Sequence, residues 1–216
     1  MTRIVGIVCG LKSEAAAVRA ALPPAVDARV AVSGANAARA ESLARELAEA
    51  AGVAALLSVG VSGGLDPALA PGDLIVTGRV VRKGEAAPAG EEPLIYGADE
   101  IVASAGAKRD LRATTGAAAV DMESHGVARA AAVAALPFLA VRAIADPASD
   151  ALPRAALGAV APDGSTRVLA TLAACARRPS DFPKLLALGR QSNAALARLR
   201  RDLGPIVHGF LRRLDL

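Results

Sequence analysis

Short apolar runs alternate along this chain with Ala-rich stretches whose apolar positions recur at helical spacing. The runs are nearly continuous rather than alternating, which is typical of strands in a sheet covered on both faces. Helices on both sides of a sheet make an α/β sandwich, the fold class that we expect. The predicted strands are Ile4–Cys9, Arg29–Ser33, Ala54–Val61, Asp73–Val81, Ile101–Ser104, Ala117–Met122 and Phe138–Ile144, and the predicted helices are Ser13–Ala21, Ala37–Ala51, Glu123–Ala135, Ser165–Ala176 and Pro183–Leu203.

Acidic residues and glycines gather where the predicted strands end. Glu123 and Asp146 each stand at the edge of an apolar run, and Gly10 and Gly60–Gly64 fall at or just after the ends of two other runs. A carboxylate is costly to bury unless it is paired or hydrogen-bonded, so such residues are candidates for chemistry. Ligands of open α/β sheets bind outside the carboxyl ends of strands, and we therefore expect these residues to converge on one pocket.

The composition bounds the class of protein. The 216 residues are enough for one domain with a sizeable core, and we treat 1–216 as a single domain. The chain is 53% hydrophobic but only 2% aromatic, so small aliphatic side chains must fill the core. The net charge of +4 is modest, and bases would find almost no aromatic side chain to stack on. These features argue against a nucleic-acid partner.

The cysteines and histidines are too few for a disulfide framework or a zinc site. Cys9 and Cys175 are the only cysteines, and His125 and His208 the only histidines. We therefore expect no metal, and a buried structural thiol at Cys9. The first residues read as a strand rather than a signal peptide, and no apolar run is long enough to span a bilayer. The sequence thus predicts a cytoplasmic protein.

The C-terminal segment 181–216 is amphipathic, with leucines interleaved with arginines. We interpret it mainly as a closing helix packed on the sheet. The alternative is a basic surface that rests on anionic lipid. Gly204 and Pro205 are expected to break the helix and leave Ile206–Leu214 as a separate segment.

Each candidate residue also has a plain structural explanation. Glu14 and Glu123 suit the first turn of a helix, where the helix dipole favours an acid. Asp146 precedes Pro147 and suits a turn, and the Gly60–Leu65 stretch suits a tight turn as well as a ligand loop. Arg142 suits the role of balancing a buried carboxylate. The joint occurrence of these features in order favours a site over these separate explanations.

That order resembles the nucleoside phosphorylase superfamily, especially its methylthioadenosine/S-adenosylhomocysteine nucleosidase branch. The resemblance rests on Gly60–Leu65, on Pro71–Val76, on Val120–Glu123 and on Val141–Asp146. The Val-Asp-Met-Glu-Ser form at 120–124, and an Arg- and Leu-rich tail that starts at Asp181-Phe182-Pro183, are more similar still to the hopanoid-associated phosphorylases of bacteria. The resemblance implies a three-layer α/β/α sandwich with a mixed central sheet.

The resemblance also implies the reaction and its residues. The reaction is cleavage of an N-ribosidic bond through an oxocarbenium-like transition state, with release of adenine. Asp146 matches the acid that protonates the purine, and Glu14 the acid that activates water. Glu123 matches the carboxylate that binds the ribose hydroxyls, and Met122 the residue that packs against the sugar. The remaining expected substrate-binding residues are Ser62, Gly63 and Ser104.

The resemblance leaves the nucleophile open. Glu14 favours water over phosphate, so we expect hydrolysis and no cofactor, with phosphate as an alternative co-substrate. Phosphorolysis usually needs an arginine beside the Gly-rich segment, and Arg39 is a weak candidate for it. We expect a homo-oligomer, as is common in the superfamily.

The chain departs from the nucleosidases in two places. The polar, loop-like stretch 82–99 is short, and Ala105–Ala107 replaces a segment that carries an aromatic residue against the base. A more open pocket would suit a nucleoside with a bulky apolar 5′ group, such as adenosylhopane in hopanoid biosynthesis, and contact with the inner membrane face. The alternatives are a general methylthioadenosine-type nucleosidase, a purine nucleoside phosphorylase, and a ligand-binding protein without turnover.

Overall fold

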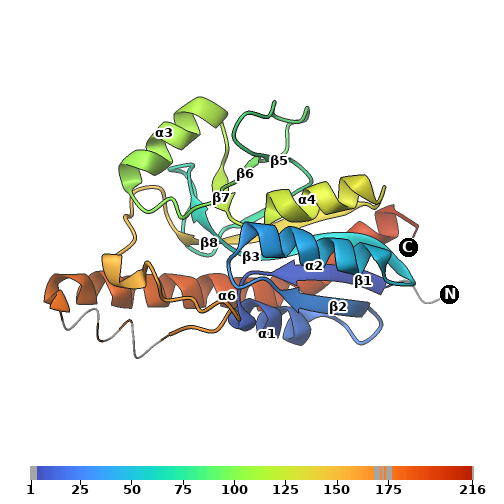
Figure 1. Cartoon of the computed structure of the whole chain (residues 1–216), viewed down its shortest axis with the longest axis horizontal. Coiled ribbons are helices and arrows are strands. Elements are labelled where there is room, and N and C mark those ends of the chain that lie inside the picture. The colour runs from blue at the N-terminus through green and yellow to red at the C-terminus, as the bar shows by residue number, and fades with distance from the viewer. Residues whose placement is uncertain (1–3, 168–170, 172, 174–176, 216) are drawn as a thin grey trace.

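A mixed eight-stranded sheet lies between two layers of helices in the computed structural model, which describes residues 4–167, 171, 173 and 177–215 (Figure 1). The order along the sheet is β2-β1-β3-β7-β6-β5, with β8 paired to β3 and β4 paired to β8. The strands are β1 (Ile4–Cys9), β2 (Asp27–Val32), β3 (Val53–Gly64), β4 (Leu74–Thr77), β5 (Val80–Val81), β6 (Ile95–Gly97), β7 (Ala119–Asp121) and β8 (Phe138–Asp146). The α-helices are α1 (Lys12–Ala21), α2 (Ala37–Glu49), α3 (Ala105–Thr115), α4 (Ser124–Val133) and α6 (Phe182–Arg213).

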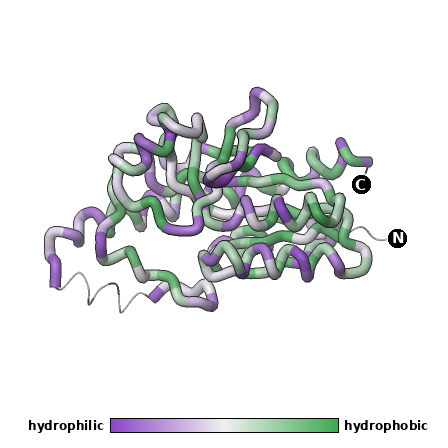
Figure 2. The backbone as a smooth tube through the Cα atoms, turned by 45° about the horizontal axis from the view of Figure 1, so that its top comes forward, coloured by the Kyte–Doolittle hydropathy of each residue, from purple (hydrophilic) through white to green (hydrophobic). Residues whose placement is uncertain are grey.

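Each face of the sheet buries its own hydrophobic cluster. Helices α1 and α6 cover one face, where Val18, Leu199 and Leu203 pack against side chains of β1, β3 and β8. Helices α2 and α4 cover the other face through small residues such as Ala44 and Ala130. Hydrophobic positions follow the strands, and hydrophilic positions lie along the outer helices (Figure 2). The predicted α/β sandwich with a mixed sheet is confirmed.

Strand β3 has two different neighbours along one edge. Strand β1 runs parallel to it as far as the pair Val8 and Ser58, whereas β7 runs antiparallel to it and pairs with Gly63 and Gly64. The other edge of β3 belongs to β8, up to the pair Gly63 and Asp146. The carboxyl ends of β1 and β7 therefore face each other along β3 and leave a gap between them. Crevices of this kind, where neighbouring strands part, are where α/β sheets bind ligands.

The sequence prediction was wrong around α3. Residues Ile101–Ser104, predicted as a strand, form a loop, and the following residues form α3. The loop-like stretch 82–99 instead contains the short strand β6. Both ends of α3 carry ordinary signals, because the Ser104 side chain accepts a hydrogen bond from the Ala107 N–H and Gly116 ends the helix at φ 70°. The predicted strand Asp73–Val81 is divided into β4 and β5, which pair with different strands.

Helix α6 does not break at Gly204 and Pro205, contrary to the prediction. A proline inside a helix costs about 3 kcal/mol, whereas burying one large apolar side chain contributes about 1.5–3 kcal/mol. Leu203, Val207 and Phe210 are all buried around the proline, so packing outweighs its cost. Gly204 lies where a Cβ would stand 2.7 Å from the Ala21 carbonyl oxygen, which lets α6 approach the end of α1.

Part of the sequence prediction lies outside the described residues. Cys175 and most of the predicted helix Ser165–Ala176 belong to this group. Cys9 is buried and unbonded, as expected of a structural thiol. Among the described helices, none is long and apolar enough to cross a membrane.

Candidate active site

Glu14 lies in the gap between β1 and β7, held there by backbone N–H groups. It is placed in the first turn of α1, directly after β1, and its side chain is buried. One carboxylate oxygen accepts hydrogen bonds from the N–H groups of Gly10 and Leu11, both at 2.8 Å. The other accepts from the Val61 N–H, also at 2.8 Å. Val61 is beyond the last residue of β3 that pairs with β1, so its N–H group is available to the carboxylate.

Arg142 lies beneath the gap and binds the acidic residues that follow β7. Its guanidinium pairs with Asp121, donates to the Ser58 hydroxyl at 2.6 Å and lies 3.6 Å from a carboxylate oxygen of Glu123. Asp121 also accepts hydrogen bonds from Ser124, which begins α4. The Nη1 atom of Arg142 is buried and has no hydrogen-bond partner within the described part of the chain. We refer to Glu14, Asp121, Glu123 and Arg142 as the carboxylate cluster.

Two glycines let the carboxylate cluster close up. A Cβ on Gly10 would stand 2.7 Å from a carboxylate oxygen of Glu123 and 3.3 Å from one of Glu14. A Cβ on Gly60 would stand 2.7 Å from the other oxygen of Glu14 and 2.5 Å from Arg142 Nη1. Real Cβ atoms do not approach polar atoms so closely, and glycine is therefore required at both positions. The unpartnered Nη1 atom is thus directed at the same place as a Glu14 oxygen.

The cluster holds three buried carboxyl groups against one guanidinium. Burial raises the pKa of Glu123 to about 8, with Arg142 opposing the rise and Asp121 and Glu14 adding to it. Burial also raises the pKa of Glu14, and Arg142 and three backbone N–H groups oppose that rise. At neutral pH, Glu123 therefore keeps a proton. The cluster contains both a hydrogen-bond donor at Glu123 and a proton acceptor at Glu14.

Asp146 ends β8 next to Gly63 and is paired with a buried lysine. Lys108 of α3 donates to Asp146 Oδ2 at 2.5 Å, and its side chain is completely buried. A Cβ on Gly63 would stand 3.2 Å from the same oxygen, which places Asp146 beside the end of β3. Burial raises the pKa of Asp146, and the charge and hydrogen bond of Lys108 oppose that rise.

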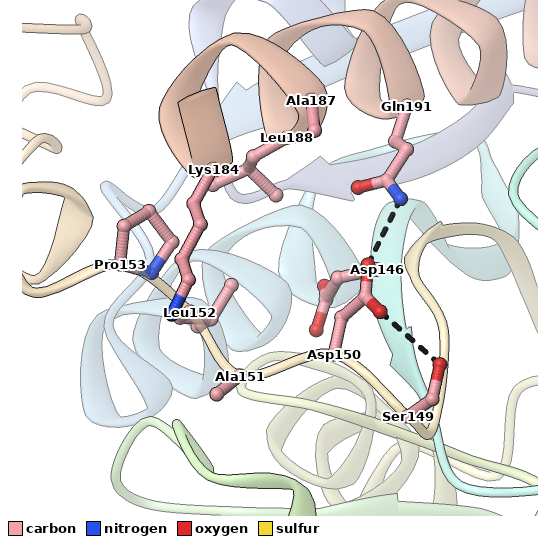
Figure 3. A pocket seen from close by; sticks show the side chains of 10 residues that line it. All are labelled: Asp146, Ser149, Asp150, Ala151, Leu152, Pro153, Lys184, Ala187, Leu188 and Gln191. Atoms are coloured by element: carbon pink, nitrogen blue, oxygen red, sulfur yellow. Dashed lines mark hydrogen bonds between the residues drawn. The ribbon is translucent and has the colours of Figure 1, made fainter. Parts of the chain in front are cut away.

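A cavity of about 340 Å³ opens beside Asp146 (Figure 3). One wall is the loop after β8, in which the Asp150 carboxylate accepts hydrogen bonds from Ser149 and from Gln191 of α6. The opposite wall is the first half of α6. The lining residues are Asp146, Ser149, Asp150, Ala151, Leu152, Pro153, Lys184, Ala187, Leu188 and Gln191. Its mixture of apolar and hydrogen-bonding groups is typical of a small-molecule site.

Three of the other predicted site residues lie close to the carboxylate cluster or to Asp146. Met122 is half-buried between Asp121 and Glu123, and Ser62 is buried with a hydroxyl that has no hydrogen-bond partner in the described residues. Gly63 pairs with Asp146. Residues 60–64 belong to β3 itself, so the interpretation of this stretch as a loop was wrong. These residues lie with the cluster or beside Asp146.

Ser104 and Arg39 are occupied elsewhere. Ser104 is exposed and caps α3, which connects it to neither carboxylate, and its role in substrate binding stays a prediction. Arg39 is exposed on α2 and donates to the Pro162 carbonyl at 2.6 Å. His125 is buried, and its Nε2 atom lies 3.2 Å from a carboxylate oxygen of Asp99.

Two residues of the site escaped the sequence analysis. Asp121 lies within the 120–124 motif but was given no role of its own, although its place at the end of an apolar run was a usable signal. Lys108 has no such signal, because it lies in a polar stretch between Ala107 and Arg109 that reads as an exposed helix face. Its partner is 38 positions away in the chain.

Solved structures with the same fold include nucleosidases and a hydrolase. A 5′-methylthioadenosine/S-adenosylhomocysteine nucleosidase from Colwellia psychrerythraea, in complex with adenine, superposes with a TM-score of 0.62 at 21% identity, covering 80% of this chain and 96% of that one. Futalosine hydrolase of Helicobacter pylori gives 0.65 at 17% identity, covering 93% and 97%. The S-adenosylhomocysteine nucleosidase of Streptococcus pyogenes gives 0.62 at 18% identity, covering 94% and 98%. At these identities the likeness shows a common fold.

Sequence comparison identifies the family. No curated protein matches the chain. The family model described as the phosphorylase superfamily matches residues 24–94 and 92–177, which together span more than half of the 216 residues. The matched region includes β3, β7 and β8, the strands whose ends carry the carboxylate cluster and Asp146. The chain belongs to the phosphorylase superfamily.

Proposed function

We propose that this protein hydrolyses the N-ribosidic bond of a 5′-substituted adenosine and releases adenine. The observation that carries the proposal is that a Glu14 oxygen and the unpartnered Nη1 atom of Arg142 both face the same point beside Gly60. A carboxylate and a guanidinium directed at one point suit a water molecule that must be oriented and deprotonated. The nucleosidases that share the fold support the same reaction class.

The attacking water is activated by Glu14. Burial raises the pKa of Glu14, which makes its carboxylate a better base than an exposed one. As the bond to the base lengthens, positive charge develops on the ribose, and the nearby carboxylates stabilise it. Glu123 holds a proton and can both donate to and accept from the ribose hydroxyls. Met122, the neighbouring half-buried residue, packs against the sugar.

The leaving base is protonated from the Asp146 side of the site. Departure of a purine anion is slow unless a proton reaches it, and Asp146 stands at the end of the strand next to Gly63. The cavity beside Asp146 is the proposed base pocket. Its volume of about 340 Å³ leaves room for a purine and part of a neighbouring group.

Water is favoured over phosphate as the nucleophile. A phosphate ion needs free cationic donors, whereas Arg142 already binds Asp121 and Ser58 and has one donor atom without a partner. Arg39 donates to the Pro162 carbonyl instead. No cofactor enters this proposal, and phosphate-dependent turnover would contradict it.

The proposed substrate is adenosylhopane, which would be converted to ribosylhopane. The support is the sequence resemblance at 120–124 and at 181–183, together with exposed apolar side chains at the start of α6. Phe182 and Leu186 are 53% and 51% exposed, beside the basic residues Lys184 and Arg190. This part of α6 projects past the end of the sheet (Figure 1). We propose that it contacts anionic lipid at the inner membrane face of the cell, and that the protein is a homo-oligomer.

The test is chromatographic detection of adenine after incubation with adenosylhopane or with 5′-methylthioadenosine, each with and without phosphate. We expect phosphate-independent adenine release, and none from the Asp146→Asn variant. Release from 5′-methylthioadenosine alone would replace the lipid substrate with a small one. No release from either nucleoside by folded protein would contradict the proposed activity and favour ligand binding without turnover.

A further inference from the structure

Lys108 is buried beside Asp146 and is not a surface lysine. Its side chain is completely buried, and it is the one buried residue of α3. A lysine is almost never fully buried unless it is paired, and burying a charge is costly. The cost of holding Lys108 here must be offset by its partners.

The partners of Lys108 all belong to the end of β8 and the loop that follows. Its Nζ atom donates to the Asp146 carboxylate at 2.5 Å, to the Pro147 carbonyl at 2.9 Å and to the Asp150 carbonyl at 3.0 Å. The Asp146 carbonyl oxygen is a fourth, more distant acceptor at 3.5 Å. The three shorter contacts match the three N–H groups of an ammonium, whereas a neutral amine has only two. The contacts therefore fit a charged lysine beside an ionised aspartate.

An ionised Asp146 has no proton to give to a leaving base. The ammonium bound to it has one, and the carboxylate can take up this proton and pass it on. We infer that Lys108 is the proton source for the leaving base and that Asp146 relays this proton. The inference rests on the proposed function and deepens it.

The relay balances as follows. The bond between C1′ and the purine nitrogen breaks, and its electron pair goes to the base. Lys108 gives a proton to the ionised Asp146 carboxylate and becomes a neutral amine. Asp146 passes this same proton on to the purine and is left ionised again. The attacking water forms a bond to C1′ and loses its proton to Glu14. Exchange with solvent then returns a proton to Lys108 and removes one from Glu14.

Two other charged groups border the pair. The Asp150 carboxylate lies in the same loop and acts on Asp146 by its charge. Lys184 stands in the cavity wall formed by α6. Neither contacts Lys108 through its side chain, so a change at Lys108 tests the relay without removing them.

The relay and a merely electrostatic lysine predict opposite pH shifts. If the pair gives up the lysine proton, activity persists until Lys108 itself is deprotonated. Replacing Lys108 by Gln would then leave Asp146 as the acid, and the alkaline fall of kcat/KM would move to lower pH. If Lys108 only lowers the pKa of Asp146, its removal would raise that pKa and move the fall to higher pH.

A second variant separates proton supply from positioning. Lys108→Arg keeps a positive charge and several N–H donors, but arginine does not release its proton in proteins. A purely positional role would be rescued by this variant. A proton source would not, so we expect a folded protein with kcat lowered about 100-fold and KM little changed.

The experiment measures kcat/KM for adenine release between pH 5 and pH 10, with whichever of adenosylhopane and 5′-methylthioadenosine the wild type cleaves. Arg109→Gln, at the exposed neighbouring position of α3, is the matched control, and thermal unfolding reports folding. The relay would be supported if the alkaline fall of kcat/KM moves to lower pH in Lys108→Gln and if Lys108→Arg is folded but inactive. If this fall stays at the same pH or moves to higher pH in Lys108→Gln, or if Lys108→Arg is fully active, the relay is overturned while the proposed function stays in place. An inactive wild type would instead contradict the proposed function.

Discussion

The carboxylates of Glu14 and Glu123 meet at Gly10. A Cβ there would stand 3.3 Å from one and 2.7 Å from the other, although the two acids follow different strands. Two buried carboxyl groups so close together are stable only because Arg142 and a retained proton reduce their charge. This relationship leads directly to the first two predictions.

Gly10→Ala is expected to force the two carboxylates apart. Overpacking of a buried site typically costs about 1–3 kcal/mol, and a displaced general base loses its alignment with water. We expect adenine release to fall at least about 10-fold and the free energy of unfolding to fall within that range. Gly158→Ala is the control, because a Cβ there meets nothing within 4 Å. Equal activity in the two variants would contradict the geometry at Gly10.

Glu123→Gln is expected to stabilise the protein most at alkaline pH. The pKa of Glu123 is raised from 4.5 in the unfolded chain to about 8 in the folded protein. Between these values the folded state binds the extra proton, so stability is greatest below pH 4.5 and is lost as pH rises to 8. Glutamine removes this contribution, and we expect its gain over wild type to grow by roughly 1–3 kcal/mol between pH 6 and pH 9.

Urea unfolding of the Glu123 variant at both pH values provides the measurement. Glu49→Gln, an exposed position at the end of α2, is the control and should show no such trend. A pH-independent difference between Glu123→Gln and wild type would mean that Glu123 is ionised in the folded protein at neutral pH.

Glu14→Gln is expected to impair turnover far more than stability. The amide has one acceptor oxygen in place of two, so at least one of the bonds from Gly10, Leu11 and Val61 is lost, at a cost of about 1–2 kcal/mol. Loss of a general base lowers kcat by about 10²–10⁴-fold. Adenine release and nucleoside binding by calorimetry would separate the two effects. Retained kcat would show that water is activated by another group.

Replacing Phe182 and Leu186 by Ser is expected to weaken binding to anionic vesicles. Each side chain is about half exposed on α6, and burying one such side chain in the membrane interface contributes on the order of 1 kcal/mol. Co-sedimentation at low salt would measure the change. Val133→Ser on α4 is the control, since Val133 is 76% exposed on a different helix. Failure of the wild type to bind such vesicles would contradict the membrane contact.

The sequence was informative wherever function depends on strand ends. Glu123 and Asp146 could be found because an acid at the edge of an apolar run is unusual, and Glu14 because the motif order resembles a family. Lys108 could not be found in this way. Its burial is decided by the packing of α3 over the loop after β8, a contact between distant segments. The uninterrupted α6 was missed for a related reason, because local proline chemistry is outweighed there by burial on the sheet.

The backbone N–H group of Val61 binds Glu14 because neither β1 nor β7 pairs with β3 at that point. Any amino acid except proline supplies the same donor, so the hydrogen bond that holds the carboxylate does not depend on the side chain at position 61. The substitutions commonly used to map active sites leave this contact untouched. Replacing the peptide bond before Val61 by an ester, which removes only the N–H group, would reach it.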